Sequence, residues 1–198
     1  RQLDICAKAK DAAEIVTACT AALSADTLLA SNRPTVLFNR AVGHTRSRAY
    51  DLAIADLDKA IAAAPERAAY YSQRGHAYYA KSQYDLAAAD YTRAIERGAK
   101  SANDFSNRGN AYFDLGDFAK AMPDYDAALD LAPDNAVVRA YRGSTLLRLG
   151  RADDAIPDLS FMIEKGGDKV LPADYGNRAI ALTEVGRQSE AAADFAKV

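Results

Sequence analysis

Bulky apolar residues recur three and four positions apart around a small residue along most of the chain. Tyr71, Gly75 and Tyr78 form one such set, and a similar set begins with Ala87 and Tyr91. Residues at this spacing lie on one face of an α-helix, so each set predicts an amphipathic helix. Because glycine-containing breaks separate the sets, the pattern predicts pairs of helices joined by short turns.

The helix pairs repeat with a fixed period. The tripeptides Gln73-Arg74-Gly75, Asn107-Arg108-Gly109 and Tyr141-Arg142-Gly143 recur at intervals of 34 residues, and Asn39-Arg40-Ala41 falls one period earlier. Asn177-Arg178-Ala179 follows 36 residues after the last of them, so two residues are inserted near Lys169 to Leu171. This register divides the chain into an N-terminal helical hairpin, residues 1–33, and repeats at 34–67, 68–101, 102–135, 136–169 and 172–198.

Small residues predict how each pair of helices packs. Gly75, Gly109 and Gly143 on the first helices are expected to oppose alanines on the second helices, where a larger side chain would hold the helices apart. These alanines are Ala53, Ala87, Ala121, Ala155 and Ala191. One hairpin cannot bury its apolar stripe alone, so neighbouring hairpins are expected to stack. The predicted fold class is all-α, a right-handed superhelix of about five helical hairpins plus the N-terminal hairpin.

The repeated unit resembles the tetratricopeptide repeat (TPR). The resemblance rests on the Gly-x2-Tyr and Ala-x3-Tyr elements and on the closing prolines Pro65 and Pro133. It covers about 165 of the 198 residues, from Pro34 to the end. The Asn-Arg-Gly and Ala-x2-Asp-Tyr motifs also resemble those of bacterial members of this family, including exported proteins of α-proteobacteria.

The resemblance implies a concave groove, lined by the first helices, that holds an extended segment or helix of a partner. The implied lining is Phe38, Asn39, Ser72, Gln73, His76, Tyr79, Ser106, Asn107, Asn110, Phe113, Tyr141, Ser144, Arg148 and Asn177. Four amides, Asn39, Gln73, Asn107 and Asn177, form a row that is expected to hydrogen-bond a peptide backbone. The lysine clamp of chaperone-binding members is missing, because Phe38, Ser72, Ser106, Ala140 and Gly176 stand at its positions.

Three residues depart from the repeat pattern. Arg139 occupies a place that is usually aromatic, His44 replaces an expected tyrosine, and Met162 stands where earlier repeats have alanine. Since the two-residue insertion follows Met162, we expect an irregular superhelical step between the fourth and fifth repeats.

An arginine and an aspartate recur sixteen residues apart in every repeat. The pairs are Arg40 and Asp56, Arg74 and Asp90, Arg108 and Asp124, Arg142 and Asp158, and Arg178 and Asp194. Because each arginine has a nearby carboxylate, a half-buried structural ladder is favoured over a charged binding strip. We expect each aspartate to pair with the arginine of the following repeat, for example Asp56 with Arg74.

The two cysteines, Cys6 and Cys19, both precede the first clear repeat. A turn at Lys10 to Ala12 would bring both thiols to the inner face of a hairpin, which favours a disulfide and an oxidising compartment. Two reduced buried thiols remain an alternative, whereas a metal site is disfavoured because there is no Cys-x2-Cys spacing. Together with the bacterial resemblance, this favours a periplasmic or secreted protein, with the cytoplasm as the alternative.

Composition excludes several classes of function. The net charge is −2 and positive and negative residues are interspersed, so the sequence lacks the basic stripe that nucleic-acid binding requires. Apolar runs are too short for a membrane span, and the start at Arg1 shows no signal pattern, although a leader could have been removed. His44 falls on a buried face and His76 on the groove, and neither belongs to a catalytic motif.

These observations predict a protein- or peptide-binding scaffold that is not an enzyme and needs no cofactor or metal. One alternative is a module that assembles with copies of itself, since the last hairpin lacks an obvious polar capping helix. Another is the recognition module of a longer enzyme or complex.

Overall fold

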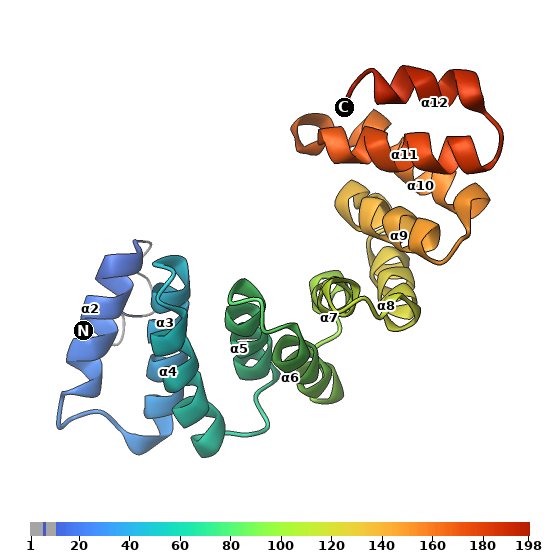
Figure 1. Cartoon of the computed structure of the whole chain (residues 1–198). Helices are drawn as coiled ribbons and strands as arrows, with labels where there is room; N and C mark the ends of the chain where they lie inside the picture. Colours follow the sequence, from blue (N-terminus) through green and yellow to red (C-terminus); the bar gives the residue numbers. More distant parts are fainter. Residues whose placement is uncertain (1–5, 7–10) are drawn as a thin grey trace. The chain divides into compact units, whose positions relative to one another are not determined.

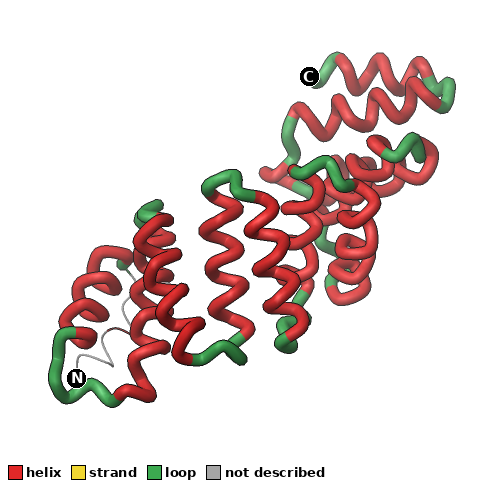
Figure 2. The backbone as a smooth tube through the Cα atoms, turned by 60° about the horizontal axis from the view of Figure 1, so that its bottom comes forward, coloured by secondary structure: helices red, strands yellow, loops and turns green. Residues whose placement is uncertain are grey.

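The computed structural model describes residue 6 and residues 11–198, and the regular elements there are helical. The first helices of the repeats are α3 (Arg33–Arg46), α5 (Ala68–Ala80), α7 (Ala102–Asp114), α9 (Ala136–Arg148) and α11 (Pro172–Glu184). The second helices are α4 (Tyr50–Ala63), α6 (Tyr84–Glu96), α8 (Phe118–Leu131), α10 (Ala152–Lys165) and α12 (Gln188–Phe195). Helix α2 (Ala12–Leu23) and the 3₁₀ helices η1 (Ala30–Asn32) and η2 (Gly167–Lys169) complete the set, and the described part contains no strand (Figure 2). The all-α prediction is confirmed.

The chain forms two compact units, residues 1–100 and 101–198. In the first unit, α2 packs on α3, and α3 and α5 pair with α4 and α6 (Figure 1). In the second unit, α7, α9 and α11 pair with α8, α10 and α12. Within each unit the second helix of one hairpin also packs on the first helix of the next, as expected for stacked hairpins. Contacts are therefore local in sequence.

Local sequence explains where the helices begin and turn. Gly116 and Gly150 adopt φ of 77° and 71°, a left-handed conformation that ends the first helix at little cost. The side chain of Ser101 accepts the Asp104 N–H, and the Asp104 side chain accepts the Ser101 N–H, so α7 starts with a capping box.

The glycines of the first helices lie close to the second helix, where the nearest atoms belong to a large side chain. At Gly75 and Gly143 the predicted alanines are also close, since an added Cβ would lie 3.3 Å from the carbonyl oxygens of Ala87 and Ala155. A Cβ added at Gly109 would lie 2.9 Å from Cε1 of Tyr125, and one at Gly75 would lie 3.0 Å from Cε1 of Tyr91. A Cβ added at Gly143 would lie 2.8 Å from Cγ of Leu159. The glycine thus makes room for the residue four positions after the alanine of the second helix.

The five arginine–aspartate pairs all form, but within one repeat. Nε and Nη2 of Arg40 donate to Oδ2 and Oδ1 of Asp56, both at 2.7 Å. The same two-pronged contact joins Arg74 to Asp90, Arg108 to Asp124, Arg142 to Asp158 and Arg178 to Asp194, at 2.6 to 3.1 Å. The five aspartates are buried. The expectation that Asp56 pairs with Arg74 is wrong, because the carboxylate faces the first helix of its own hairpin.

The arginines nevertheless reach the preceding hairpin through a further N–H. Nη1 of Arg74 donates to Asp58 at 2.6 Å, and Nη1 of Arg142 donates to Asp126 at 2.8 Å. At the other junctions described within the units, Nη1 donates to a hydroxyl of the preceding second helix, from Arg40 to Thr20 and from Arg178 to Ser160. Each of these arginines therefore links three helices.

Arg139 takes over the hydrogen bond of the aromatic residue that it replaces. In the first unit the hydroxyl of Tyr71 donates to the carbonyl of Pro65 at 3.0 Å. Nε of Arg139 donates to the carbonyl of the equivalent Pro133 at 2.9 Å, and its guanidinium lies 4.3 Å from the ring centroid of Phe161. The closing proline carbonyl is thus satisfied in both cases.

The N-terminal hairpin is tied by a disulfide between Cys6 and Cys19, both buried. Asp11 caps α2 by accepting the N–H groups of Ala13 and Glu14. Of the turn predicted at Lys10 to Ala12, Lys10 lies outside the described residues and Ala12 is the first residue of α2. The predicted helix before this turn falls, apart from Cys6, outside the described residues. The oxidising compartment stays a prediction.

Met162 is buried, and η2 lies between it and the two-residue insertion. The irregular step expected between the fourth and fifth repeats stays a prediction.

Replacing Gly109 with alanine is expected to lower the free energy of unfolding by about 1–2 kcal/mol. The added methyl group would clash with the Tyr125 ring, and the free-energy cost of this clash exceeds the gain from the higher helix propensity of alanine. Gly176→Ala is the matched control, since the nearest atom to its Cβ would be Val198 Cγ2 at 3.7 Å. The control is expected to gain up to about 1 kcal/mol. Urea unfolding measures both, and equal effects would contradict the packing described.

Replacing Asp158 with alanine is expected to cost about 3 kcal/mol, because it leaves Arg139 and Arg142 without their shared buried carboxylate. Asp126→Ala is the matched control, because it removes the exposed partner of Arg142. The Asp126 side chain is 53% exposed, against 3% for the Asp158 side chain. That control should cost under about 1 kcal/mol. Similar losses in thermal and urea unfolding would show that burial of the aspartate does not matter.

Candidate functional site

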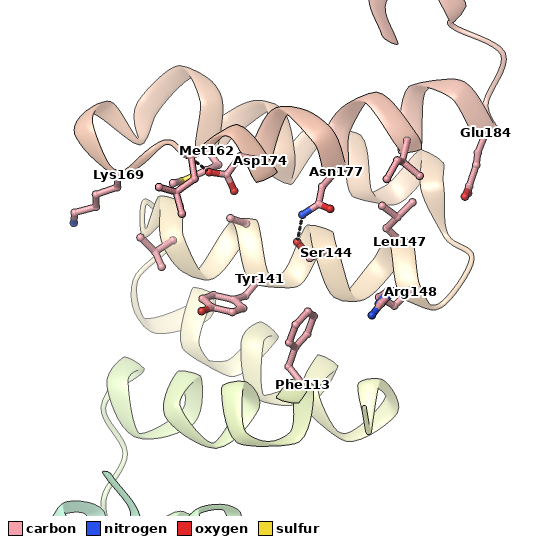
Figure 3. Close-up of a pocket in the computed structure, with 14 residues that line it drawn as sticks. Phe113, Tyr141, Ser144, Leu147, Arg148, Met162, Lys169, Asp174, Asn177 and Glu184 are labelled. Atoms are coloured by element: carbon pink, nitrogen blue, oxygen red, sulfur yellow. Dashed lines mark hydrogen bonds between the residues drawn. The ribbon is translucent and has the colours of Figure 1, made fainter. Parts of the chain in front are cut away.

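The second unit carries a hollow on the surface formed by α7, α9 and α11, which we call its first-helix face. Tyr141, Ser144 and Arg148 follow one another at helical spacing on α9, and Asn177 and Ile180 do so on α11. Together with Phe113 of α7, these residues line a cavity of about 780 Å³ (Figure 3). A space of this size accommodates several side chains of a bound molecule.

Aromatic rings form one wall of the hollow and hold one another in place. Phe113 packs edge-to-face on Tyr141, with centroids 5.7 Å apart, and also on Phe118 at 5.4 Å. Tyr141 stacks on the buried Tyr125 at 6.0 Å. Since each ring is supported from behind, the wall offers a preformed apolar surface.

Polar groups in the middle of the hollow are partly used by the protein. Nδ2 of Asn177 donates to Oγ of Ser144 at 3.1 Å, which links α11 to α9 (Figure 3). Oδ2 of Asp174 accepts the Leu171 N–H at 2.7 Å and caps α11. An amide has a second N–H and a carbonyl oxygen, so Asn177 is still able to bind a peptide group.

Charged side chains lie at the two ends of the hollow. Lys169 lies at one end, and Glu184 lies at the other on the same side as Arg148 (Figure 3). The guanidinium of Arg148 is 5.5 Å from the ring centroid of Phe118. Burial raises the pKa of the Tyr141 phenol, and the carboxylates of Asp114 and Asp174 raise it further, so this hydroxyl stays neutral.

Five of the fourteen predicted groove residues line this hollow, namely Phe113, Tyr141, Ser144, Arg148 and Asn177. Two other predicted residues of the second unit serve its packing. Ser106 is buried and its hydroxyl donates to the Asn103 carbonyl, and Asn110 accepts the Tyr125 hydroxyl at 3.0 Å. Asn107 is half-buried.

In the first unit, most predicted groove residues contact neighbouring elements. Phe38 packs on Tyr70 with centroids 5.2 Å apart, and Tyr79 packs on Tyr84 at 5.3 Å. Ser72 is half-buried, whereas His76 is exposed on α5.

The predicted amide row has a structural task as well. Nδ2 of Asn39 lies 3.9 Å from the sulfur of Cys6, and Nε2 of Gln73 donates to Oγ1 of Thr45 at 3.1 Å. With the bond from Asn177 to Ser144, three of the four amides donate to the hairpin before their own. The row therefore fixes neighbouring first helices, in addition to any contact with a ligand.

Sequence reasoning missed several residues of the hollow. They are Val137, Ala140, Leu147, Met162, Lys169, Leu171, Asp174, Ile180 and Glu184. Val137, Ile180 and Glu184 share helical spacing with predicted residues and could have been found from it. Leu171 belongs to the two-residue insertion and Lys169 directly precedes it, so the repeat register is a poor guide there.

Neither His44 nor His76 lines the hollow. His44 is 13% exposed with Nε2 3.9 Å from Asp56, and burial lowers the pKa of its imidazole. The lining of the hollow contains neither histidine nor cysteine. Over residues 11–198 and Cys6, no cluster of His, Cys, Asp and Glu side chains fits a metal ion, and no helix is long and apolar enough to span a bilayer.

Comparison with known proteins identifies the repeats. One tetratricopeptide-repeat family model matches residues 102–135, and another matches residues 38–104. No curated protein matches the sequence significantly.

Solved structures share the fold at low sequence identity. YrrB, a TPR protein with an unusual peptide-binding site, superposes with a TM-score of 0.79 at 20% identity, covering 92% of this chain and 91% of YrrB. MamA superposes with a TM-score of 0.77 at 19% identity, covering 84% of this chain and 90% of MamA. A second MamA structure gives 0.72 at 20% identity, covering 79% and 91%. These likenesses show the fold alone.

Proposed function

This chain is a tetratricopeptide-repeat protein, and we propose that it is a scaffold that holds an extended segment of a partner protein on its first-helix faces. The observation that carries this proposal is the hollow between α7, α9 and α11. The hollow suits a polypeptide, because the side chains of a bound segment can pack on its preformed apolar wall. The backbone of the same segment can hydrogen-bond to its central amide. The peptide-binding site of YrrB, a protein of the same fold, supports the proposal.

The hollow does not suit catalysis. Its ionisable groups are Asp174, which caps α11, the neutral Tyr141, and the separate charges Lys169, Arg148 and Glu184. A hydrolytic or transfer reaction needs a nucleophile in reach of a base. We therefore propose binding without chemistry at this surface.

Photo-cross-linking tests the proposal. Benzoylphenylalanine would be placed on first helices, at His76 of α5 and at Ile180 of α11. Leu86 of α6 and Leu131 of α8 serve as controls on second helices, since they are 42% and 55% exposed against 43% for Ile180. We expect partner adducts from the first-helix positions at several times the yield of the controls. Adducts that form equally from all four positions, or only from the controls, would contradict the proposal.

Assembly with copies of itself is a second candidate function, favoured by apolar exposure on the last hairpin. Phe195 and Val198 are 51% and 67% exposed. An apolar surface there fits end-to-end stacking of hairpins from two copies.

Sedimentation equilibrium distinguishes this candidate from a monomeric scaffold. If stacking occurs, the mean mass rises with concentration, and Phe195→Ser weakens association about tenfold by removing buried apolar area. A mass that stays monomeric at all concentrations would end this candidate.

A further inference from the structure

The hollow of the second unit differs in its chemistry from one end to the other. We propose that it selects a segment with a bulky aliphatic or aromatic residue next to an acidic residue, the acidic residue being directed to Lys169. This inference rests on the proposed function and names the class of partner.

The apolar part of the inference follows from exposed aliphatic side chains that line the hollow. Leu171 and Ile180 are 59% and 43% exposed, and both belong to the lining. A single exposed aliphatic residue is ordinary on a protein surface. Here the two residues border the same space as the supported rings of Phe113 and Tyr141. Since about 13 Å of helix separates Leu171 from Ile180, neighbouring apolar side chains of one extended segment would cover them.

The polar groups in the centre do not compete with such a side chain. Ser144 and Asn177 already bind each other, so a bound segment has to satisfy only the hydrogen-bonding groups that this bond leaves over. The remaining amide groups of Asn177 suit the backbone of the same segment. An extended chain would thus be bound by its backbone at the centre and by its side chain at the wall.

The acidic part follows from the distribution of charge. Lys169 precedes α11, whereas Glu184 is its last residue, so about 18 Å of helix lies between the two ends. At the Glu184 end the positive Arg148 offsets the carboxylate. At the Lys169 end the only acidic lining residue is Asp174, whose carboxylate caps the Leu171 N–H. Because Asp174 already occupies the N-terminus of α11, the exposed ammonium group of Lys169 is the group at this end that would attract an anionic side chain.

Selection from a phage-displayed library of random twelve-residue peptides, with the full chain as bait, tests the inference. The chain as it stands is expected to enrich peptides with an aliphatic or aromatic residue and an Asp or Glu at a fixed spacing. Lys169→Glu is expected to replace that preference with Lys or Arg at the same position. Ile180→Asp is expected to weaken the binding of the synthesised peptides about tenfold.

Two matched controls separate the hollow from general surface effects. Lys165→Glu changes an exposed charge on α10, and Leu131→Asp changes an exposed leucine on α8, and neither residue lines the hollow. Both controls are expected to keep the selected motif and the affinity. Circular dichroism and thermal unfolding verify that all four variants keep the fold.

The outcomes distinguish this inference from the proposed function. If the enriched peptides ignore the Lys169 and Ile180 variants but lose binding with His76→Ala, the first-helix scaffold stands and the inference is overturned. If peptides bind the hollow without an acidic preference, the inference is likewise overturned. If no peptide is enriched by any version of the chain, both the inference and the proposed function fail.

Discussion

The structure depends on a buried aspartate carboxylate on the second helix of each repeat and on the arginine that donates hydrogen bonds to both of its oxygens. We call this two-pronged guanidinium the arginine fork. A buried aspartate without a cation would be strongly destabilising, so the two helices are able to pack only in the register that brings the fork to both oxygens. The fork then uses a further N–H to reach the preceding second helix, at Asp58 from Arg74 and at Asp126 from Arg142. One side chain thus fixes both the hairpin and its junction with the neighbour.

This interaction also determines what the first-helix face presents. Arg142 points to α10 and α8, and because neighbouring residues on a helix differ by about 100° in direction, Tyr141 and Ser144 are turned to the other side of α9. The glycines that follow Arg74, Arg108 and Arg142 let the ring or leucine of the second helix fill the space between the helices. The charges of the ladder are therefore used inside the hairpins, and the face is left with apolar residues, amides and a few charges at its ends.

Much of the fold could be predicted from the sequence, because each contact involves residues close in the chain. The period of 34 residues and the spacing of Gly109 and Tyr112 suffice for the helix pairs. The partner of each aspartate could not be predicted with the same ease. Arg40 and Arg74 lie sixteen and eighteen residues from Asp56, and only the orientation of α4 in the hairpin decides between them.

The candidate site was predicted in part for the same reason. Tyr141 and Asn177 follow from the repeat register, since equivalent residues occupy equivalent places. Leu171 comes from an insertion without an equivalent in other repeats, and Lys169 directly precedes that insertion. Met162 reaches the hollow from a second helix. The use of Gln73 and Asn177 as links between first helices depends on the distance between those helices, which no spacing in the sequence reveals.

The most direct measurement of the central claim is a pair of double-mutant cycles on urea unfolding, one for Arg142 with Asp158 and one for Arg142 with Asp126. If the buried fork holds the hairpin together, the first cycle gives a coupling free energy of about 2–3 kcal/mol and the second gives under about 1 kcal/mol. Equal coupling in the two cycles, or none in the first, would contradict the account.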